Sequence, residues 1–482
     1  MKRIKLVAVC FGIALTVVSA RVFYVGVIKQ GDYTESVMSQ RVESVKFLSP
    51  RGIIYDRNMI KFTDAKMKLV IKSGKPYYVG NRTGNMLSHV IGYISGDGKG
   101  CGIEGAFDYV LGADKSSEIS YIKDINNTKI SRGYNIDIAK SYRGVSLTVD
   151  YHIQKIVENA MDFYKINGAA IVVDCKSGGI LAMASRPNYN VANLEKYLEG
   201  KDGELVNKAI CAYNPGSVFK ILIASAFLEN HYNDEVYFEC NGKSVIDGVE
   251  FVCHKEEGHG VQSLEQAFAN SCNCAFYNLG NMVGIEDIYS YSADFGLGKE
   301  VLCINGIAED RGIVPSAVSN QRELANISIG QGDVMVTPLQ IADMLCTICN
   351  GGVRKQLTLI RGMVDENGQC TEIQGTDIGR VISETTARRL TDMMNTAVES
   401  GTGMSAQLDK CPAGGKTGSA ETGWLKDGKM MQQGWFAGYF PAQNPRYVCV
   451  VIAENGIRGS DSACPVFKRI GDEMEKSKFF NW

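Results

Sequence analysis

A continuous run of apolar positions occurs near the N-terminus of the chain. Residues 6–20 are almost wholly apolar, and after Arg21 the apolar run continues to Ile28. The run reaches the roughly twenty residues that a transmembrane helix needs, and three basic residues precede it. By the positive-inside rule these residues face the cytoplasm. We therefore expect residues 1–28 to form a cytoplasmic tip and a single-pass membrane anchor, with the rest of the chain outside the cytoplasm.

The same segment also has features of a cleaved signal peptide. Val18-Ser19-Ala20 resembles a small-residue cleavage site. However, the apolar stretch continues past Ala20, and Arg21 can reach the headgroups from the outer end of the span. The length of the run therefore favours the uncleaved anchor.

Residues 29–143 show short and mixed patterns. Residues 51–58 are interpreted as a charged loop with a strand, residues 89–94 as a strand, and residues 102–108 as the start of a short helix. None of these segments carries catalytic chemistry by itself. We interpret residues 29–143 as a structural pedestal.

From about Gly144 the pattern becomes that of a larger domain, residues 144–482. A helical period leads to Tyr164, and residues 169–184 follow a strand–turn–strand pattern. The middle of the domain is helical, and the last part contains three strand candidates and a closing amphipathic helix: the segment from Lys416, residues 434–439, residues 447–453 and the helix from about Pro465 to Phe479. Two early strands and three late strands around helices predict an α+β fold, an antiparallel five-stranded sheet with helices on both sides.

A second dense apolar run follows the stretch Asn-Pro-Gly-Ser-Val-Phe-Lys that ends at Lys220. The run is too dense to be amphipathic, so it predicts a helix that is buried on nearly every side. Ser217 and Lys220 are three residues apart and share one face of a helix. Because burial of a lone ammonium is costly, Lys220 would tend to lose its proton and could act as a base toward Ser217. A short motif of this kind also arises by chance.

Two further motifs follow in order, Ser271-Cys272-Asn273 and Lys416-Thr417-Gly418-Ser419. The order Ser-x-x-Lys, Ser-x-Asn and Lys-Thr-Gly is typical of the penicillin-interacting serine enzymes, which are the penicillin-binding proteins and the serine β-lactamases. The chain resembles this family over essentially its whole length. The stretch Arg51-Gly-Ile-Ile-Tyr-Asp-Arg-Asn58 is similar to the N-terminal module, of the dimerisation type, of class B penicillin-binding proteins.

The resemblance implies the penicillin-binding transpeptidase fold and a serine D,D-transpeptidase that cross-links peptidoglycan stem peptides through an acyl-enzyme and is acylated by β-lactams. Ser217 would be the nucleophile. Its base would be Lys220, because the chain has five His and none lies in the three motifs. By the same resemblance, Ser271 would relay a proton to the departing amine and Asn273 would hydrogen-bond the donor peptide. No cofactor is needed for this chemistry.

The third motif is assigned to substrate binding by the same resemblance. Lys416 would add positive charge to the cleft, and Thr417 would grip the terminal carboxylate of the substrate or of penicillin. Gly418 and Ser419 belong to the same substrate-binding motif, although Lys416-Thr417-Gly418 alone could be any exposed strand with a glycine for close approach. The backbone N–H groups of Ser217 and Ser419 would hold the oxyanion. Each of these positions also has a structural explanation when taken singly; Asn273, for example, could be a helix cap.

Three other activities use the same motifs. A serine β-lactamase would need a base for a hydrolytic water and would lack the N-terminal module. A β-lactam sensor would need a cytoplasmic signalling portion, and a D,D-carboxypeptidase would differ only in using water as the acceptor. A net charge of −2 and a pI near 6.3 argue against a nucleic-acid partner. The class B layout implies a polytopic glycan polymerase of the shape, elongation, division and sporulation family as the partner.

Fifteen Cys make an odd count that is high for an exported protein, and many lie singly in apolar runs as small buried hydrophobic residues. Cys240, Cys253, His259 and Cys272 are spaced by 13, 6 and 13 residues. Three thiolates and an imidazole are enough for a closed tetrahedral zinc site. Since Ser271 and Asn273 must face the cleft, Cys272 between them should point into the domain.

We therefore expect a structural zinc site behind the second motif, and some class B relatives resembled by this chain carry zinc nearby. His254 could replace His259, and Cys274 could replace Cys272 less well. A disulfide between Cys240 and Cys253 is the main alternative in an oxidising exterior. Buried unpaired thiols are the third.

Overall fold

The computed structural model describes residues 2–31, 42–48, 51–72, 75–82, 84–94, 100–112, 116–122, 135–137, 143–198, 200, 202–230, 235–373, 375–426, 429–454 and 458–479. The chain divides into two compact units. Unit 1 comprises Met1–Arg51, Ala65–Asn81 and Gly112–Ser141, and unit 2 comprises Gly52–Asp64, Arg82–Leu111 and Tyr142–Trp482. Residues 29–143, predicted as one pedestal, are thus divided between the two units.

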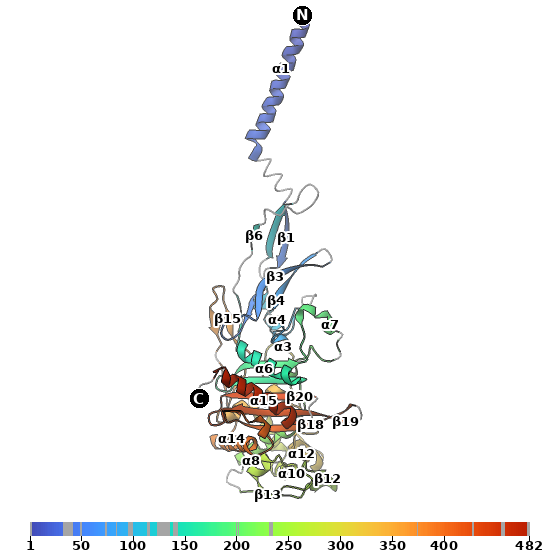
Figure 1. The fold of residues 1–482 in the computed structure, drawn as a ribbon, viewed down its shortest axis with the longest axis vertical. Coiled ribbons are helices and arrows are strands. Elements are labelled where there is room, and N and C mark those ends of the chain that lie inside the picture. Colours follow the sequence, from blue (N-terminus) through green and yellow to red (C-terminus); the bar gives the residue numbers. More distant parts are fainter. Residues whose placement is uncertain are drawn as a thin grey trace. The chain divides into compact units, whose positions relative to one another are not determined.

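The N-terminal apolar run of unit 1 is helical. Helix α1 (Lys2–Phe23) continues into the π-helical turn η1 (Tyr24–Ile28) (Figure 1). Together they form the one helix, within the described part of the chain, that is long and apolar enough to cross a membrane. None of their residues is buried. The length and the apolar character of the predicted span are therefore present in the structure.

The remaining described elements of unit 1 are strands. Three form a sheet in the order β1-β5-β6, and two more, β3 and β4, pair with each other. Their bounds are β1 (Val42–Leu48), β3 (Thr63–Lys72), β4 (Lys75–Arg82), β5 (Ser116–Ile122) and β6 (Asn135–Asp137).

The charged segment near residue 56 ties the start of unit 2 to its first long helix. Strand β2 (Ile53–Tyr55) pairs in parallel with β7 (Gly144–Leu147). The Asp56 carboxylate, which is buried, accepts hydrogen bonds from the backbone N–H groups of Asn58 and Tyr151 over 2.7 and 3.1 Å. The Asn58 amide in turn donates to Asp150, the N-cap of α6, over 2.9 Å. This loop therefore fixes the position where α6 begins.

The centre of unit 2 is a five-stranded antiparallel sheet in the order β18-β19-β20-β8-β9. The bounds of its strands are β8 (Gly168–Asp174), β9 (Gly179–Arg186), β18 (Gly414–Lys426), β19 (Lys429–Phe440) and β20 (Tyr447–Ala453). Strands β8, β9 and β20 are buried along their whole length. The predicted five-stranded sheet is confirmed.

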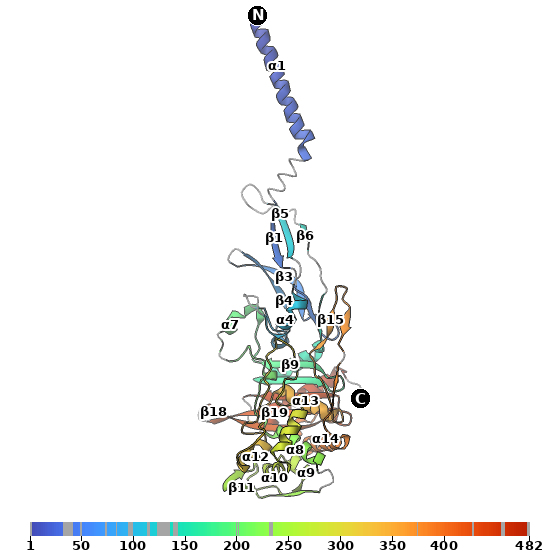
Figure 2. The ribbon, with the colours of Figure 1, turned by 180° about the vertical axis from the view of Figure 1, so that it is seen from behind.

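Helices cover both faces of this sheet (Figures 1 and 2). Helices α6 (Tyr151–Tyr164) and α15 (Gly459–Lys476) pack on one face, and α8 (Lys220–Asn230), α13 (Pro338–Cys349) and α14 (Glu384–Glu399) belong to the other. Alternate residues of the strands therefore enter two separate hydrophobic cores. The larger core contains α8, whose residues 220–228 are all buried, as the apolar run predicted.

The other described elements of unit 2 lie outside the central sheet. They are α3 (Ser88–Ile91), α4 (Gly102–Ala106), α5 (Asp108–Leu111), η2 (Val191–Asn193), α7 (Glu195–Leu198), η3 (Lys208–Ile210), η4 (Gly216–Phe219), β10 (Tyr237–Cys240), β11 (Lys243–Ile246), β12 (Val249–Val252), β13 (Gly260–Ser263), α9 (Leu264–Ala269), α10 (Asn273–Val283), α11 (Ile285–Asp294), α12 (Gln321–Ser328), β14 (Val353–Lys355), β15 (Ile360–Val364), β16 (Cys370–Glu372), β17 (Asp377–Arg380) and η5 (Met404–Ala406).

Two local predictions are wrong. Residues 89–94, predicted as a strand, begin in the helix α3. The reason is that Leu87 adopts a left-handed conformation, with φ of 57°, and starts a helical turn there. The closing helix begins six residues before Pro465, at Gly459. It extends upstream because Ala463 and Cys464 are both fully buried in the core on that face of the sheet.

Candidate active site

Ser217 lies in a tight turn, η4, that packs directly against strand β18. Gly216 has φ of +54°, and a Cβ there would lie 2.5 Å from the carbonyl oxygen of Ser419. Only glycine allows this approach. The backbone N–H of Gly216 also donates to the carbonyl oxygen of Gly330 over 3.0 Å. The turn is therefore held between β18 and the loop at Gly330, and Ser217 is its second residue.

Asn214, three residues before Ser217, fixes this turn further. The Asn214 amide donates to the carbonyl oxygens of Gly332 and Val334 over 2.9 and 2.6 Å. The indole N–H of Trp435, a fully buried residue of β19, donates to the carbonyl oxygen of Asn214 over 3.1 Å. The nucleophile candidate is thus carried on a rigid support.

Lys220 brings the first and second motifs together. Its side chain is fully buried. Its Nζ atom donates to the carbonyl oxygen of Ser271 over 2.7 Å and to Oδ1 of Asn273 over 2.8 Å, and it lies 3.4 Å from Oγ of Ser271. The Lys220 amine is therefore engaged with the second motif. Among the described residues, the side chains of Ser217 and Lys220 form no hydrogen bond with each other.

Burial makes the neutral amine of Lys220 easier to form. Burial lowers the pKa of Lys220 to about 8, although the nearby thiols of Cys272, Cys253 and Cys274 act in the opposite direction. A neutral amine has two N–H donors and one lone pair. In the neutral form, the two short bonds to the carbonyl oxygen of Ser271 and Oδ1 of Asn273 would use the donors and leave the lone pair for a hydroxyl proton. The geometry therefore suits a base.

The second motif lies between α9 and α10. Ser271 has φ of 54°, a left-handed conformation that is uncommon for a residue with a Cβ. Its carbonyl oxygen is the one that accepts from Lys220. Cys272 is the N-cap of α10 and Asn273 is its first residue, so the alternative that Asn273 is the cap is wrong. Strained residues of this kind gather at functional sites, where neighbouring contacts hold them in place.

The third motif lies on β18. Lys416 is fully buried, with its Nζ 5.7 Å from the centre of the Phe268 ring. Burial, and then the charge of Lys220, lower the pKa of Lys416 well below its ordinary value. These surroundings disfavour the positive charge that was predicted for Lys416. Thr417 is largely buried, whereas Ser419 is exposed and accepts from the backbone N–H of Gly459 over 3.2 Å.

Gly418 lies where another part of the chain approaches β18 closely. A Cβ on Gly418 would lie 2.8 Å from the carbonyl oxygen of Pro215. The Ser217 turn therefore meets β18 at Gly418 as well as at Ser419. The three motifs predicted from the sequence lie around one site.

The hydroxyl of Thr402 is part of this site and was not predicted from the sequence. It lies 2.7 Å from the hydroxyl oxygen of Thr417. Its one local signal is the stretch Ser-Gly-Thr-Gly over residues 400–403, which resembles any tight turn.

The four residues of the predicted metal site form a cluster behind the second motif. One donor atom each from Cys240, Cys253, His259 and Cys272 lie within 4.8 Å of one another. The three cysteines are buried and His259 is half-buried. Sγ of Cys253 lies 3.7 Å from Nδ1 of His259 and 4.0 Å from Sγ of Cys272, and Sγ of Cys240 lies 3.5 Å from Nδ1 of His259. Cys272 contributes its Sγ to this cluster, whereas the carbonyl oxygen of Ser271 and Oδ1 of Asn273 accept hydrogen bonds from Lys220.

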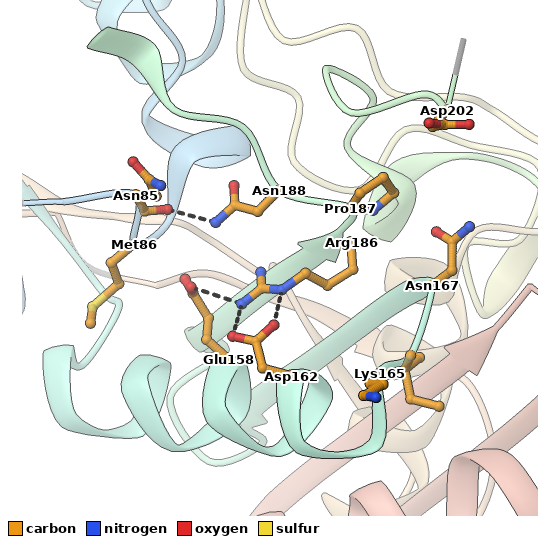
Figure 3. Close-up of a pocket in the computed structure, with 11 residues that line it drawn as sticks. Asn85, Met86, Glu158, Asp162, Lys165, Asn167, Arg186, Pro187, Asn188 and Asp202 are labelled. Atoms are coloured by element: carbon orange, nitrogen blue, oxygen red, sulfur yellow. Dashed lines mark hydrogen bonds and ion pairs between the residues drawn. The ribbon is translucent and has the colours of Figure 1, made fainter. Parts of the chain in front are cut away.

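A separate cavity of about 850 Å³ lies at the β9 edge of the sheet, and no motif residue lines it (Figure 3). Arg186 is the buried cation of this cavity. Its guanidinium pairs with Asp162 over 2.6 Å and with Glu158 over 3.1 Å. Both carboxylates come from α6, so these pairs join α6 to the end of β9.

Comparison with known proteins identifies one protein family for this chain. The family model described as the penicillin binding protein transpeptidase domain matches residues 168–472. Stage V sporulation protein D of Bacillus subtilis is 31% identical over 77% of this chain, and PbpB of Mycobacterium tuberculosis is 32% identical over 80% of it. The chain spans 59% and 60% of the lengths of these two relatives.

Solved structures agree with the family. The D,D-transpeptidase domain of a peptidoglycan glycosyltransferase from Eggerthella lenta matches with a TM-score of 0.74 and 26% identity, covering 90% of this chain and all of that one. Penicillin-binding protein 3 of Mycobacterium tuberculosis, in complex with aztreonam, matches with a TM-score of 0.71 and 27% identity, covering 90% and 98% of the two chains.

Proposed function

The chain belongs to the penicillin-binding protein transpeptidase family, and on this premise we propose that it is a serine D,D-transpeptidase. It would cross-link peptidoglycan stem peptides through an acyl-enzyme and would be acylated by β-lactams. The observation that carries the proposal is the meeting of three motifs, because Lys220 contacts Ser271 and Asn273 while the Ser217 turn packs on β18 beside Ser419.

Acylation starts at the hydroxyl of Ser217. Its oxygen attacks the carbonyl carbon of the penultimate D-alanine, and its proton passes to the lone pair of Lys220. The backbone N–H groups of Ser217 and Ser419 are proposed to stabilise the oxyanion, and the contact between Gly216 and Ser419 supports this arrangement.

The intermediate then breaks its bond to the leaving amine. Lys220 returns the proton through Ser271, whose Oγ lies 3.4 Å from Nζ, and the terminal D-alanine leaves. The amine of a second stem peptide attacks the acyl-enzyme, loses its proton to the same base, and releases Ser217 as the amide cross-link forms. Thr417 is proposed to hold the terminal carboxylate of the donor, and Asn273 its peptide.

The acceptor distinguishes this proposal from its alternatives. We expect the purified protein, supplied with a stem peptide that ends in D-Ala-D-Ala and a second stem peptide with a free amine, to release D-alanine and form the cross-linked amide in equal amounts. D-alanine release without the amide would instead identify a D,D-carboxypeptidase. Rapid turnover of penicillin would identify a β-lactamase, and stable labelling without any peptide reaction would identify a sensor.

We also propose the membrane arrangement and the partner. Residues 1–28 would anchor the protein with its N-terminus in the cytoplasm and residues 144–482 outside, with residues 29–143 as the pedestal. The length and hydropathy of the helix Lys2–Ile28 support the anchor. The partner would be the polytopic glycan polymerase expected from the class B layout.

Co-purification tests that partner. Full-length protein is expected to retain the polymerase in mild detergent, and a chain in which residues 1–140 are replaced by an unrelated single-pass anchor is expected to lose it. Retention of the polymerase by the replaced chain would contradict the proposal.

A structural zinc ion is proposed for the cluster of Cys240, Cys253, His259 and Cys272. Zinc bonds of about 2.3 Å to sulfur and 2.0–2.1 Å to nitrogen in a tetrahedron place two sulfurs about 3.8 Å apart, and a sulfur and a nitrogen about 3.6 Å apart. The separations of 4.0 Å for Cys253–Cys272 and 3.5 and 3.7 Å for the two Cys–His259 pairs fit this geometry. All fifteen cysteines are free in this structure.

The cluster also has a clear structural role. Cys240, Cys253 and His259 lie at the ends of β10, β12 and β13, and Cys272 lies at the start of α10. Zinc would tie these short strands to the residue between Ser271 and Asn273. It would therefore brace the backbone that binds Lys220.

Elemental analysis tests the zinc. Protein purified under reducing, metal-replete conditions is expected to hold one zinc per chain. Cys272→Ser is expected to lose most of it and to unfold about 3–6 °C lower, the shift that a loss of roughly 2–4 kcal/mol gives in a domain of this size. Cys346→Ser, which alters an equally buried thiol on α13, should keep its zinc. Absence of zinc from the unaltered protein would end the proposal, whether or not Cys240 and Cys253 proved to be joined by a disulfide.

A further inference from the structure

Thr402 links the second and third motifs through two contacts. Its backbone N–H donates to the carbonyl oxygen of Ala269 over 3.1 Å. Ala269 ends α9, two residues before Ser271. The hydroxyl of Thr402 lies 2.7 Å from that of Thr417 on β18. One residue therefore joins the backbone that leads to Ser271 to the side chain that faces the substrate carboxylate in the proposed function.

The turn that carries Thr402 is closely packed. A Cβ on Gly401 would lie 2.4 Å from the carbonyl oxygen of Ala269, and the backbone N–H of Gly403 donates to the carbonyl oxygen of Ala397 over 2.9 Å. The glycines on both sides of Thr402 are thus fixed against α9 and α14. The backbone that carries the Thr402 side chain is therefore held in place on both sides.

The direction of the hydrogen bond between these two hydroxyls decides whether Thr417 has a proton to donate to a ligand. A threonine hydroxyl has one proton to donate and two lone pairs that accept. If Thr417 donates to Thr402, it has no proton left for a ligand. If Thr402 donates, the proton of Thr417 is free to point at an acceptor of a bound ligand. Among the described residues, Thr417 is the one hydrogen-bond partner of the Thr402 hydroxyl.

We propose that Thr402 is a positioning residue that donates to Thr417 and so presents the Thr417 proton to the terminal carboxylate of the acyl donor. The inference rests on the proposed function, which assigns that carboxylate to Thr417. A carboxylate turns the contact into a chain from Thr402 to Thr417 to the anion. Hydrogen bonds in such a chain strengthen one another, and a bond to an anion is stronger than a neutral one. Thr402 would therefore favour donors that carry a free carboxylate beside the reacting carbonyl.

Penicillin carries such a carboxylate, so its acylation rate is the measurement. Thr402→Val keeps the shape and the β-branching but removes the donor, and we expect it to lower the second-order rate constant about tenfold, near the upper end for a hydrogen bond between neutral groups. Thr402→Ser keeps the donor and should stay within about threefold of the unaltered protein. Thr396→Val, the same change on α14 at a hydroxyl that donates within its own helix, should have no effect.

A double-mutant cycle separates this role from a general loss of structure. In a Thr417→Val background the proton chain is already broken, so adding Thr402→Val should change the rate by less than about twofold. Independent and multiplying effects of the two changes would overturn the inference, as would a Thr402→Ser protein as slow as Thr402→Val. Full-rate labelling of Thr402→Val would overturn it too, while leaving the proposed function intact. Failure of the unaltered protein to react at Ser217 would instead contradict the proposed function.

Discussion

Ser217→Ala is expected to abolish covalent labelling of the protein by a fluorescent penicillin. The β-lactam carbonyl is captured only when an oxygen attacks it, and alanine offers no nucleophile. The turn around residue 217 is held by the backbone contacts of Gly216 with Ser419 and Gly330, which do not involve the serine hydroxyl. The variant should therefore fold normally, and the loss of labelling should reflect chemistry alone.

The neighbouring helix offers a matched control. Ser225 lies on α8, is fully buried, and donates its hydroxyl to the carbonyl oxygen of Ile221 over 2.7 Å. Ser225→Ala should label like the unaltered protein. Labelling of Ser217→Ala at the same level as Ser225→Ala, measured by gel fluorescence and by intact mass, would refute the assignment of Ser217 as the nucleophile.

The central sheet could be predicted from the sequence because its strands carry local patterns. Residues 447–453 are continuously apolar because β20 is buried on both faces, and residues 169–184 contain their own turn. The four-residue helix α3 could not be predicted in this way. Its β-branched residues favour a strand, and the helical turn depends on the left-handed conformation of Leu87.

The residues of the site could be predicted from motif order, but their contacts could not. Three short motifs separated by long stretches of chain meet because the fold places α8, α10 and β18 together. The sequence does not show that Lys220 binds Asn273 and the carbonyl oxygen of Ser271, since those contacts depend on the left-handed turn at Ser271. Thr402 carries no periodic signal, because its function depends on a turn packed against α9.

The metal cluster could be predicted from the sequence only in part. Its four residues were predicted from donor type and spacing, and the structure brings their donor atoms together. The strands that do so are four residues each, and their pairing comes from the loop geometry between Cys240 and His259. Donor chemistry is local and visible in the sequence, whereas the convergence of donors is a property of the fold.

Lys220→Ala is expected to slow acylation by roughly 10²–10⁴-fold, the usual contribution of a general base. Burial lowers the pKa of Lys220 to about 8. Only the neutral amine accepts a proton, so the acylation rate of the unaltered protein should rise about tenfold for each pH unit below about 8 and then level off. Lys416→Ala should also acylate slowly, but it should keep a rise of this kind because Lys220 is still present.

Lys220→Arg tests whether Lys220 acts as a base or only through its positive charge. A guanidinium keeps the hydrogen-bond donors toward Ser271 and Asn273 but stays protonated at all accessible pH values. Lys220→Arg should therefore be as slow as Lys220→Ala and should lose the rise with pH near 8, while Lys243→Ala, at an exposed lysine paired with Glu250, should behave like the unaltered protein. The acylation rate can be measured by stopped flow from about pH 6 to about pH 10, the range over which a group with a pKa near 8 titrates. Circular dichroism confirms that each variant is folded. A near-normal rate in Lys220→Ala, or an unchanged pH profile in Lys220→Arg, would show that the proton of Ser217 leaves by another route.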